Sequence, residues 1–307
     1  MADSGVIDQM RRGFTSATML MKIIWVNIGV FVVLRLIAIV CMFGGDVDFI
    51  NTVMKWVQLP SSLPTLATRP WTVLSYMFAQ YDVLHILFNM LWFYWFGTLF
   101  RMVSTPRQML ALYIYGGLGG AVLFLLFYNS FPMFHHASGW LIGSSASVMA
   151  IVTATAILMP DFRMHLVLIG PVALKWIALA TVGLVLLGVS GSNAGGEMAH
   201  IGGVLTGVLY ALRMKRGHDI TVPFNRLIDT IVNTWHRGSA PSRRPAGKST
   251  MPPPPRPGGQ GAPGGPSIDP ADREELDAIL DKIKKSGYAS LTPEERKRLF
   301  DVSRRMK

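Results

Sequence analysis

The stretch GWLIGSSASVMAI, residues 139–151, places small polar side chains where an apolar helix begins. Three of them are serines: Ser144, Ser145 and Ser147. The apolar run 145–159 is shorter than the roughly 17–25 residues that span a bilayer, so we expect its helix to start near Trp140. Small residues at the end of a membrane helix either allow close packing or include a nucleophile. Spacing alone does not choose between Ser144 and Ser145.

The composition places much of the remaining chain in a membrane as well. Of the 307 residues, 50% are hydrophobic and 15% are charged, whereas about 25% charge is usual in soluble domains. The apolar residues gather in six runs that approach or reach the length of a bilayer span: 21–43, 83–100, 109–128, 145–159, 166–189 and 198–212. The sequence therefore predicts an all-α membrane protein with a bundle of six transmembrane helices.

The positive charge is distributed unevenly between the loops, with a net charge of +11 for the chain. Lys and Arg gather before the first run, after the sixth, and in the second-to-third and fourth-to-fifth connections: Arg11, Arg12, Lys22, Arg101, Arg107, Arg163, Arg213, Lys215 and Arg216. The opposite loops hold only Lys55 and Arg69. Because Lys and Arg favour cytoplasmic loops, both termini are predicted to be cytoplasmic. The lipid bilayer is the expected partner of these charges, and no nucleic acid is expected.

The chain divides by composition into five segments. We expect a cytoplasmic N-terminal segment, a domain of six membrane helices, an interfacial amphipathic helix, a disordered Pro/Gly-rich linker and a C-terminal helical hairpin: 1–19, 20–213, 214–237, 238–267 and 268–307. For the amphipathic segment VPFNRLIDTIVNTWHRG, docking on the bundle is the alternative to lying on the membrane surface. In the hairpin, Thr292 and Glu295 have the spacing of a capping box.

Three further polar side chains lie inside apolar runs, where hydrocarbon penalises them. His85 and Asn89 are four positions apart on one face of the second helix, and His200 lies in the first turns of the sixth. Because the even-numbered helices are predicted to begin at the outer face, these residues and the serines should share one depth. Each has a structural alternative, since His and Asn often form hydrogen bonds between membrane helices and the small residues 143–150 favour packing.

Together these residues suit acyl transfer. A serine hydroxyl needs a base, which His200 can provide without a third acidic residue. The tetrahedral intermediate needs hydrogen-bond donors for its oxyanion, and the unpaired N–H groups at the start of the fourth helix, the Asn89 amide and the His85 ring could supply them. No metal or other cofactor is expected, because the sequence contains no His-Glu-x-x-His motif.

Three motifs on the second, fourth and sixth helices, HILFN, GSSA and AHIGG, resemble those of rhomboid intramembrane serine proteases. The stretch RPWTVLSYMF before the first motif is also similar, and the resemblance covers about residues 20–213. It implies that Ser145 is the nucleophile and His200 the general base, in a dyad without an acid. It implies an oxyanion hole formed by side chains and backbone N–H groups: His85, Asn89, Ser145 (backbone) and Ser144 (backbone).

The resemblance also assigns structural roles near the serine. Gly143 would permit the turn that presents it, while Gly203 and Gly207 would let the sixth helix approach the fourth. Two positions depart from the family pattern. Ala146 stands where Gly is frequent, and Met149 stands where an aromatic residue often packs beneath the histidine. A thioether makes comparable contacts with a ring, so we expect an altered site rather than an inactive one.

The activity implied is hydrolysis of peptide bonds in or next to transmembrane segments of membrane-anchored proteins. The expected location is a bacterial inner membrane, with the active site toward its outer face. The tail LDAILDKIKKSGYASLTPEERKRLF resembles a small domain carried by some bacterial rhomboids. A catalytically inactive rhomboid-like protein that binds and escorts membrane proteins is the alternative. A transporter is disfavoured, because no internal repeat is evident in the sequence.

Overall fold

The computed structural model describes residues 17–45, 47–131, 138–166, 169–189 and 193–238 and, in the tail, 278–279, 281–282, 291–295 and 299. The chain forms two compact units, Met1–Ala240 and Pro241–Lys307. Nearly all of the predicted N-terminal segment 1–19, the predicted linker 238–267 and most of the predicted hairpin lie outside the described residues.

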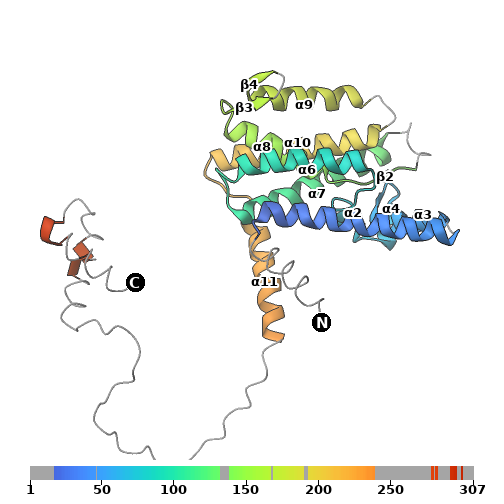
Figure 1. Ribbon diagram of the computed structural model, residues 1–307, viewed down its shortest axis with the longest axis horizontal. Coiled ribbons are helices and arrows are strands. Elements are labelled where there is room, and N and C mark those ends of the chain that lie inside the picture. The colour runs from blue at the N-terminus through green and yellow to red at the C-terminus, as the bar shows by residue number, and fades with distance from the viewer. Residues whose placement is uncertain are drawn as a thin grey trace, which may run out of the picture. The chain divides into compact units, whose positions relative to one another are not determined.

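Each of the six apolar runs forms a helix, which confirms the all-α bundle (Figure 1): α2 (Met19–Gly44), α6 (Val83–Phe100), α7 (Pro106–Ser130), α8 (Ser145–Leu158), α9 (Leu174–Gly188) and α10 (Ala194–Lys215). Three of them, α2, α6 and α7, are long and apolar enough to cross a membrane, whereas α8 and α9 are apolar but shorter. The protein is therefore a multi-pass membrane protein, and the number of six spans stays a prediction.

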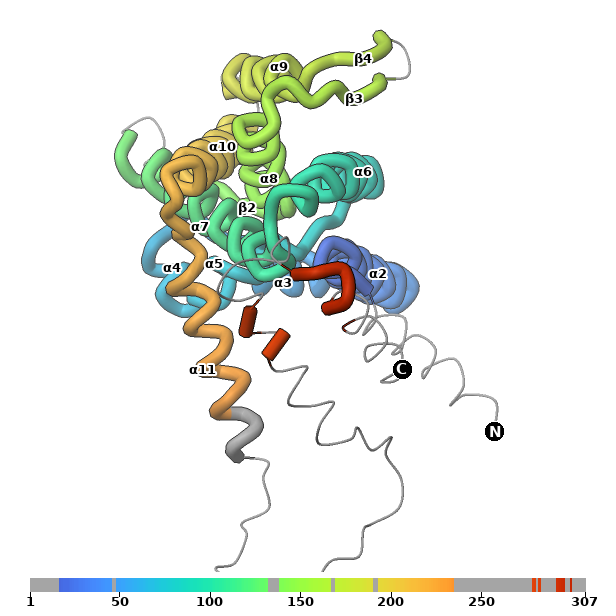
Figure 2. Tube along the Cα trace, turned by 90° about the vertical axis from the view of Figure 1, so that its left-hand side faces the viewer, coloured from blue at the N-terminus to red at the C-terminus, as the bar shows by residue number. Residues whose placement is uncertain are grey.

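The HILFN, GSSA and AHIGG motifs meet at one end of this bundle. Shorter elements complete the first unit: α3 (Val47–Val57), β1 (Leu59–Pro60), α4 (Leu63–Thr68), α5 (Thr72–Ser75), β2 (Trp140–Leu141), β3 (Arg163–Leu166), β4 (Gly170–Ala173) and α11 (Val222–Gly238). Viewed along the helices, α8 lies in the middle with α6, α7, α9 and α10 around it, and α2 lies outside against α6 and α7 (Figure 2). Helices α6, α8 and α10 all begin at the end that also holds α3, α4 and the β1–β2 pair (Figure 1).

Small residues let α8 pack tightly between α7 and α10. A Cβ atom on Gly203 of α10 would collide with the carbonyl group of Ala146, and one on Gly207 would lie 2.5 Å from the carbonyl oxygen of Ala150. On the other side of α8, a Cβ on Gly116 of α7 would lie 2.5 Å from the Cβ of Ala150. Since lipid removes most of the hydrophobic driving force between helices, such close backbone approach is a main source of their association.

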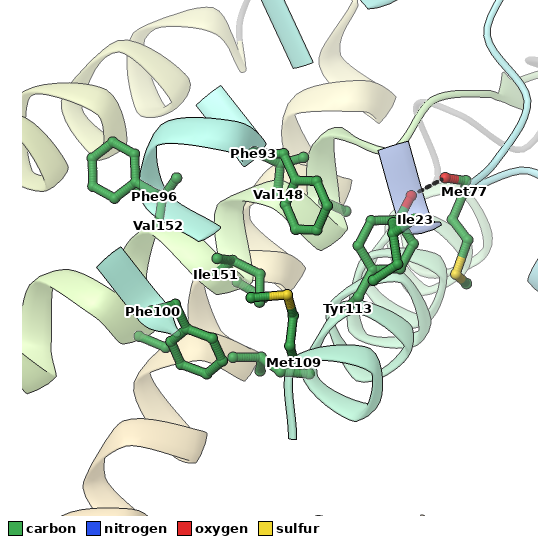
Figure 3. Packing of buried hydrophobic residues seen from close by; sticks show 14 of the residues in the cluster. Ile23, Met77, Phe93, Phe96, Phe100, Met109, Tyr113, Val148, Ile151 and Val152 are labelled. Carbon is green, nitrogen blue, oxygen red and sulfur yellow. Dashed lines mark hydrogen bonds between the residues drawn. The ribbon is translucent and has the colours of Figure 1, made fainter. Parts of the chain in front are cut away.

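Aromatic and branched side chains fill the space between α6, α7 and α8 (Figure 3). Buried members of this cluster come from all three helices: Phe93, Phe96, Phe100, Met109, Tyr113, Val148, Ile151 and Val152. The Tyr113 hydroxyl donates to the Met77 carbonyl at 2.8 Å. The Tyr113 hydroxyl is therefore paired, as buried polar groups generally are.

Two helices begin later than the apolar pattern predicts. Helix α8 begins at Ser145 and not near Trp140, because Trp140 belongs to β2 and pairs antiparallel with β1. Helix α9 begins at Leu174, because the preceding residues form the antiparallel β3–β4 pair. Gly170 there has φ of +87°, a conformation that favours glycine, and Pro171 lacks the N–H that a helix interior needs.

Within the segment 214–237, where an interfacial amphipathic helix is predicted, the chain forms helix α11, and its place at the membrane interface stays a prediction. It runs away from the bundle, across the direction of the membrane helices (Figure 1). Near its start, the Phe224 ring meets the Tyr115 ring of α7 edge-on at 5.8 Å. Farther along, Asp229 pairs with Arg107 of α7 at 3.0 Å. These contacts with α7 lie in the first half of α11, and Leu227, on the apolar side of the helix, is exposed.

The turn between α10 and α11 is also bound to α7. The Asp219 carboxylate accepts hydrogen bonds from Gln108 Nε2 and from the Thr221 backbone N–H, both at 2.8 Å. Partial burial raises the pKa of Asp219, but the hydrogen bonds from Thr221 and Gln108 outweigh it and hold the pKa below its ordinary value.

In the second unit, the described residues include the predicted capping box. The Glu295 N–H donates to Thr292 Oγ1 at 3.3 Å, and the Thr292 N–H donates to Glu295 Oε2 at 2.7 Å. Lys282 also donates to Glu295, at 2.7 Å. This confirms the helix start that the sequence predicts at Thr292.

Candidate active site

The turn before α8 presents Ser145 at the start of a helix. Gly143 has φ of +122°, a conformation that favours glycine. Its N–H donates to the Tyr76 carbonyl at 3.0 Å. Ser144 is the N-cap residue, and Ser145 is the first residue of α8. Because the first N–H groups of a helix have no intrahelical partner, α8 offers backbone donors beside the Ser145 side chain.

The structure brings Ser145 of α8 and His200 of α10 together, although 55 positions separate them in the sequence. Ser145 Oγ lies 2.7 Å from His200 Nε2. The contact forms because α8 and α10 approach closely where Gly203 faces Ala146. A hydroxyl within hydrogen-bond distance of an imidazole is the arrangement that general-base activation of a serine needs.

The second ring nitrogen of His200 contacts a residue that the sequence reasoning missed. His200 Nδ1 lies 2.9 Å from Oε2 of Glu197, and the two side chains are 20% and 19% exposed. Both residues lie on α10, three positions apart, so they share one face of the helix. That spacing was visible in the sequence, but the resemblance implied a dyad without an acid.

A buried network of hydrogen bonds orients the Asn89 side chain. Its Nδ2 donates to Gln80 Oε1 at 2.7 Å. Gln80 Nε2 in turn lies 3.2 Å from Ser144 Oγ and 3.2 Å from Asn27 Oδ1 of α2. Gln80 thus joins α2 and α6 to the residue before the candidate nucleophile. The sequence reasoning missed Gln80, because it lies before α6 rather than inside an apolar run.

His85 borders the same site from the start of α6. A Cβ on Gly143 would lie 3.2 Å from both Nε2 and Cε1 of His85 and 3.9 Å from Ser145 Oγ. The imidazole of His85 and the hydroxyl of Ser145 therefore both border the space that this glycine leaves open. The His85 backbone N–H donates to Asp82, the N-cap residue of α6, at 2.7 Å.

A cavity of about 270 Å³ opens beside the Ser145–His200 pair, bounded by α6, α8, α9 and α10. Apolar side chains supply most of its wall: Phe88, Trp92, Val148, Val152, Leu184 and Val185. Asn89, Glu197 and the two candidate catalytic residues supply the polar part. An apolar cavity with a few converging polar groups is typical of a binding or active site.

Met149 lies in the same wall, between three helices. It is buried, and it packs with Val185 of α9 and Val204 of α10. Within the part of the chain that the structure describes, no three His, Cys, Asp or Glu side chains gather as a metal site.

Comparisons with known proteins agree with the motifs. Residues 67–217 match the Rhomboid domain, and residues 270–305 match a family of unknown function (DUF6576). The chain is 25% identical over 226 residues to "RHOMBOID-like protein 12, mitochondrial" of Arabidopsis thaliana, which covers 67% of this chain and 61% of that protein. It is 29% identical over 199 residues to "Presenilin-associated rhomboid-like protein A, mitochondrial" of Danio rerio, which covers 61% of this chain and 48% of that protein.

The matches thus span about three fifths and about half of the length of these two relatives. The Rhomboid match includes all three quoted motifs and five of the six apolar runs in full, from α6 to α10. The chain belongs to the rhomboid family.

Proposed function

We propose that this protein is an intramembrane serine endopeptidase that hydrolyses peptide bonds in or next to transmembrane segments of membrane-anchored proteins. Ser145 is the nucleophile and His200 the general base. The observation that carries the proposal is the 2.7 Å separation of Ser145 Oγ and His200 Nε2. A hydrogen bond that only held two helices together would need neither the adjoining cavity nor the unpaired backbone donors at the start of α8.

The reaction is acyl transfer in two stages. The Ser145 hydroxyl proton passes to His200 Nε2 while Oγ bonds to the scissile carbonyl carbon and the carbonyl π electrons move to its oxygen. The C–N bond then breaks, and the proton passes from Nε2 to the leaving amine. Water adds to the acyl-enzyme ester in the same way, which releases the carboxyl product and restores the Ser145 hydroxyl.

The developing oxyanion is stabilised by donors from α6 and α8. The Asn89 amide has two hydrogens, and Gln80 engages the amide nitrogen through one, which leaves the other for the oxyanion. The His85 ring borders the open space at Gly143 that Ser145 Oγ also borders. The backbone N–H groups of Ser144 and Ser145 complete the set. Such donors, held in place before the reaction, are each worth about 10²–10³ in rate.

Both termini are cytoplasmic in this proposal, and Ser145 lies near the outer face. Support comes from the basic residues of the connections, which flank the opposite ends of the helices: Arg101, Arg107, Arg163 and Arg213. In Ser130→Cys and His218→Cys variants that lack Cys41, an impermeant maleimide added outside should label only the first. The reverse pattern would refute this orientation. A bacterial inner membrane stays a prediction, and both relatives are mitochondrial by name.

The test of catalysis is cleavage of a tagged transmembrane reporter, together with labelling by a fluorophosphonate probe. Ser145→Ala and His200→Ala should each reduce cleavage to background and abolish labelling, because nucleophile and base act as a unit. Ser147→Ala is the matched control. Its hydroxyl is buried on the same helix and has no hydrogen-bond partner among the described residues, so cleavage should be unchanged.

Cleavage that is equal in the wild type and in Ser145→Ala would end the proposal. A wild-type protein that neither cleaves the reporter nor reacts with the probe would favour the inactive binding and escort protein instead.

A further inference from the structure

Glu197 is the one carboxylate within the six helices of the described bundle. Carboxylates in membrane helices are costly and are usually paired or functional. A carboxylate in the first turn of a helix also interacts favourably with the helix dipole, which is the simplest structural explanation for Glu197. That explanation requires only that the charge lie near the start of α10, and it makes no demand on where the side chain points.

The side chain of Glu197 points along the helix to His200. Its Oε2 lies 2.9 Å from Nδ1, while Nε2 of the same ring lies 2.7 Å from Ser145 Oγ. An ionised carboxylate only accepts hydrogen bonds, so this contact places the ring proton on Nδ1. The lone pair of Nε2 then faces the Ser145 hydroxyl, which is the tautomer that a general base requires.

A second helix leaves room for this carboxylate. A Cβ on Gly188, the last residue of α9, would lie 2.9 Å from both Cδ and Oε1 of Glu197. The carboxylate therefore occupies space that is open because residue 188 is glycine and has no side chain. Its placement is determined by packing between α9 and α10 as well as by the spacing along α10.

We propose that Glu197 is a positioning residue for His200, so that Ser145, His200 and Glu197 form a hydrogen-bonded chain in place of an isolated Ser–His pair. Glu197 holds the Nδ1–H tautomer and the ring orientation, and its charge stabilises the imidazolium that forms when Ser145 attacks. The substrate meets Ser145 and the oxyanion donors, and Glu197 acts only through the imidazole. This inference rests on the proposed peptidase function and deepens it.

The test compares kcat and KM for reporter cleavage in full-length Glu197→Gln and Glu197→Ala proteins. Gln keeps the shape and an acceptor oxygen but removes the charge, whereas Ala removes both. We expect kcat to fall about 10-fold for Gln and on the order of 10²-fold for Ala, with KM within about twofold of the wild type. Gly188→Ala should also lower kcat, because the added methyl group crowds the intact Glu197 carboxylate.

Asp161→Asn is the matched control, because it makes the same acid-to-amide change at an exposed carboxylate that pairs with Lys175 near the start of α9. Its kcat should equal that of the wild type. The melting temperature of each variant in detergent shows whether it is folded. If folded Glu197→Ala protein keeps wild-type kcat, or if only KM and the melting temperature change, Glu197 is structural and the inference is wrong. Absence of Ser145-dependent cleavage in the wild type would instead refute the peptidase function.

Discussion

Helices α10 and α9 both flank the central helix α8, yet they are packed very differently. On α10, a Cβ added to Gly203 would collide with the Ala146 carbonyl of α8. On α9, a Cβ added to Gly183 would meet no atom within 4 Å. Leu179 and Leu184 of α9 are 61% and 70% exposed, so the rest of the protein covers little of this face of the helix.

The difference separates two requirements of the proposed reaction. Ser145 and His200 must stay within hydrogen-bond distance, and they lie on two helices whose backbones approach closely. The cavity beside them must admit a polypeptide. Helix α9 lines this cavity with Val185 and Leu184, and it is the lining helix that packs least tightly against the rest of the protein. Displacement of α9 would widen the cavity without separating α8 from α10.

The difference in packing between α10 and α9 can be tested most directly at Gly203 and Gly183. We expect Gly203→Ala to destabilise the protein by about 3 kcal/mol, because the new methyl group must push α10 away from Ala146. Cleavage should fall by about 10²-fold, since small displacements of reacting groups cost that much. Thermal unfolding in detergent and reporter cleavage measure the two effects.

Gly183→Ala is the control for this change. It adds the same methyl group to a membrane helix, but into open space, so stability and cleavage should stay within about 0.5 kcal/mol and about twofold of the wild type. Equal losses of stability and cleavage from the two substitutions would show that α9 and α10 are packed equally tightly.

A smaller effect is expected at Gln80, which extends the firmly packed region from α8 to α2. Gln80→Ala leaves Asn89, Asn27 and the Ser144 hydroxyl without their shared partner, which should cost about 1–3 kcal/mol. Because Asn89 loses its orientation, kcat should fall while KM changes little. Steady-state kinetics and thermal unfolding measure these changes.

Gln58→Ala serves as the comparison for this truncation. Gln58 follows α3, is partly buried, and its side chain forms no hydrogen bond with the residues that the structure describes. It should change stability by less than about 0.5 kcal/mol. A Gln80→Ala protein that behaves like Gln58→Ala would show that the network does not support the site.

Much of the bundle could be predicted because hydrocarbon restricts what a sequence can do. Long apolar runs in a bilayer must become helices, and polar residues such as His200 and Asn89 stand out within them. Helix starts were less predictable. Trp140 and Leu141 are apolar and read as helix, but they pair with β1, which lies 80 positions earlier in the chain at Leu59 and Pro60. No local pattern reports such a partner.

The candidate site shows the same limit at the level of single side chains. The three motifs identified Ser145, His200 and Asn89 as candidate site residues. Glu197 could have been found from its spacing to His200, but a first-turn acid has an ordinary explanation in the helix dipole. Gln80 could not be found, because its importance comes from three partners on α2, α6 and the turn before α8.

The 55 positions between Ser145 and His200 also have a consequence for biosynthesis. Ser145 leaves the ribosome well before His200, and α9 must be made and inserted between them. A nascent chain that ends before α10 therefore carries the serine without its base, and Gly203 has not yet brought α8 and α10 together. Under the proposed function, the chain is therefore unable to cleave neighbouring membrane proteins until α10 has joined the bundle.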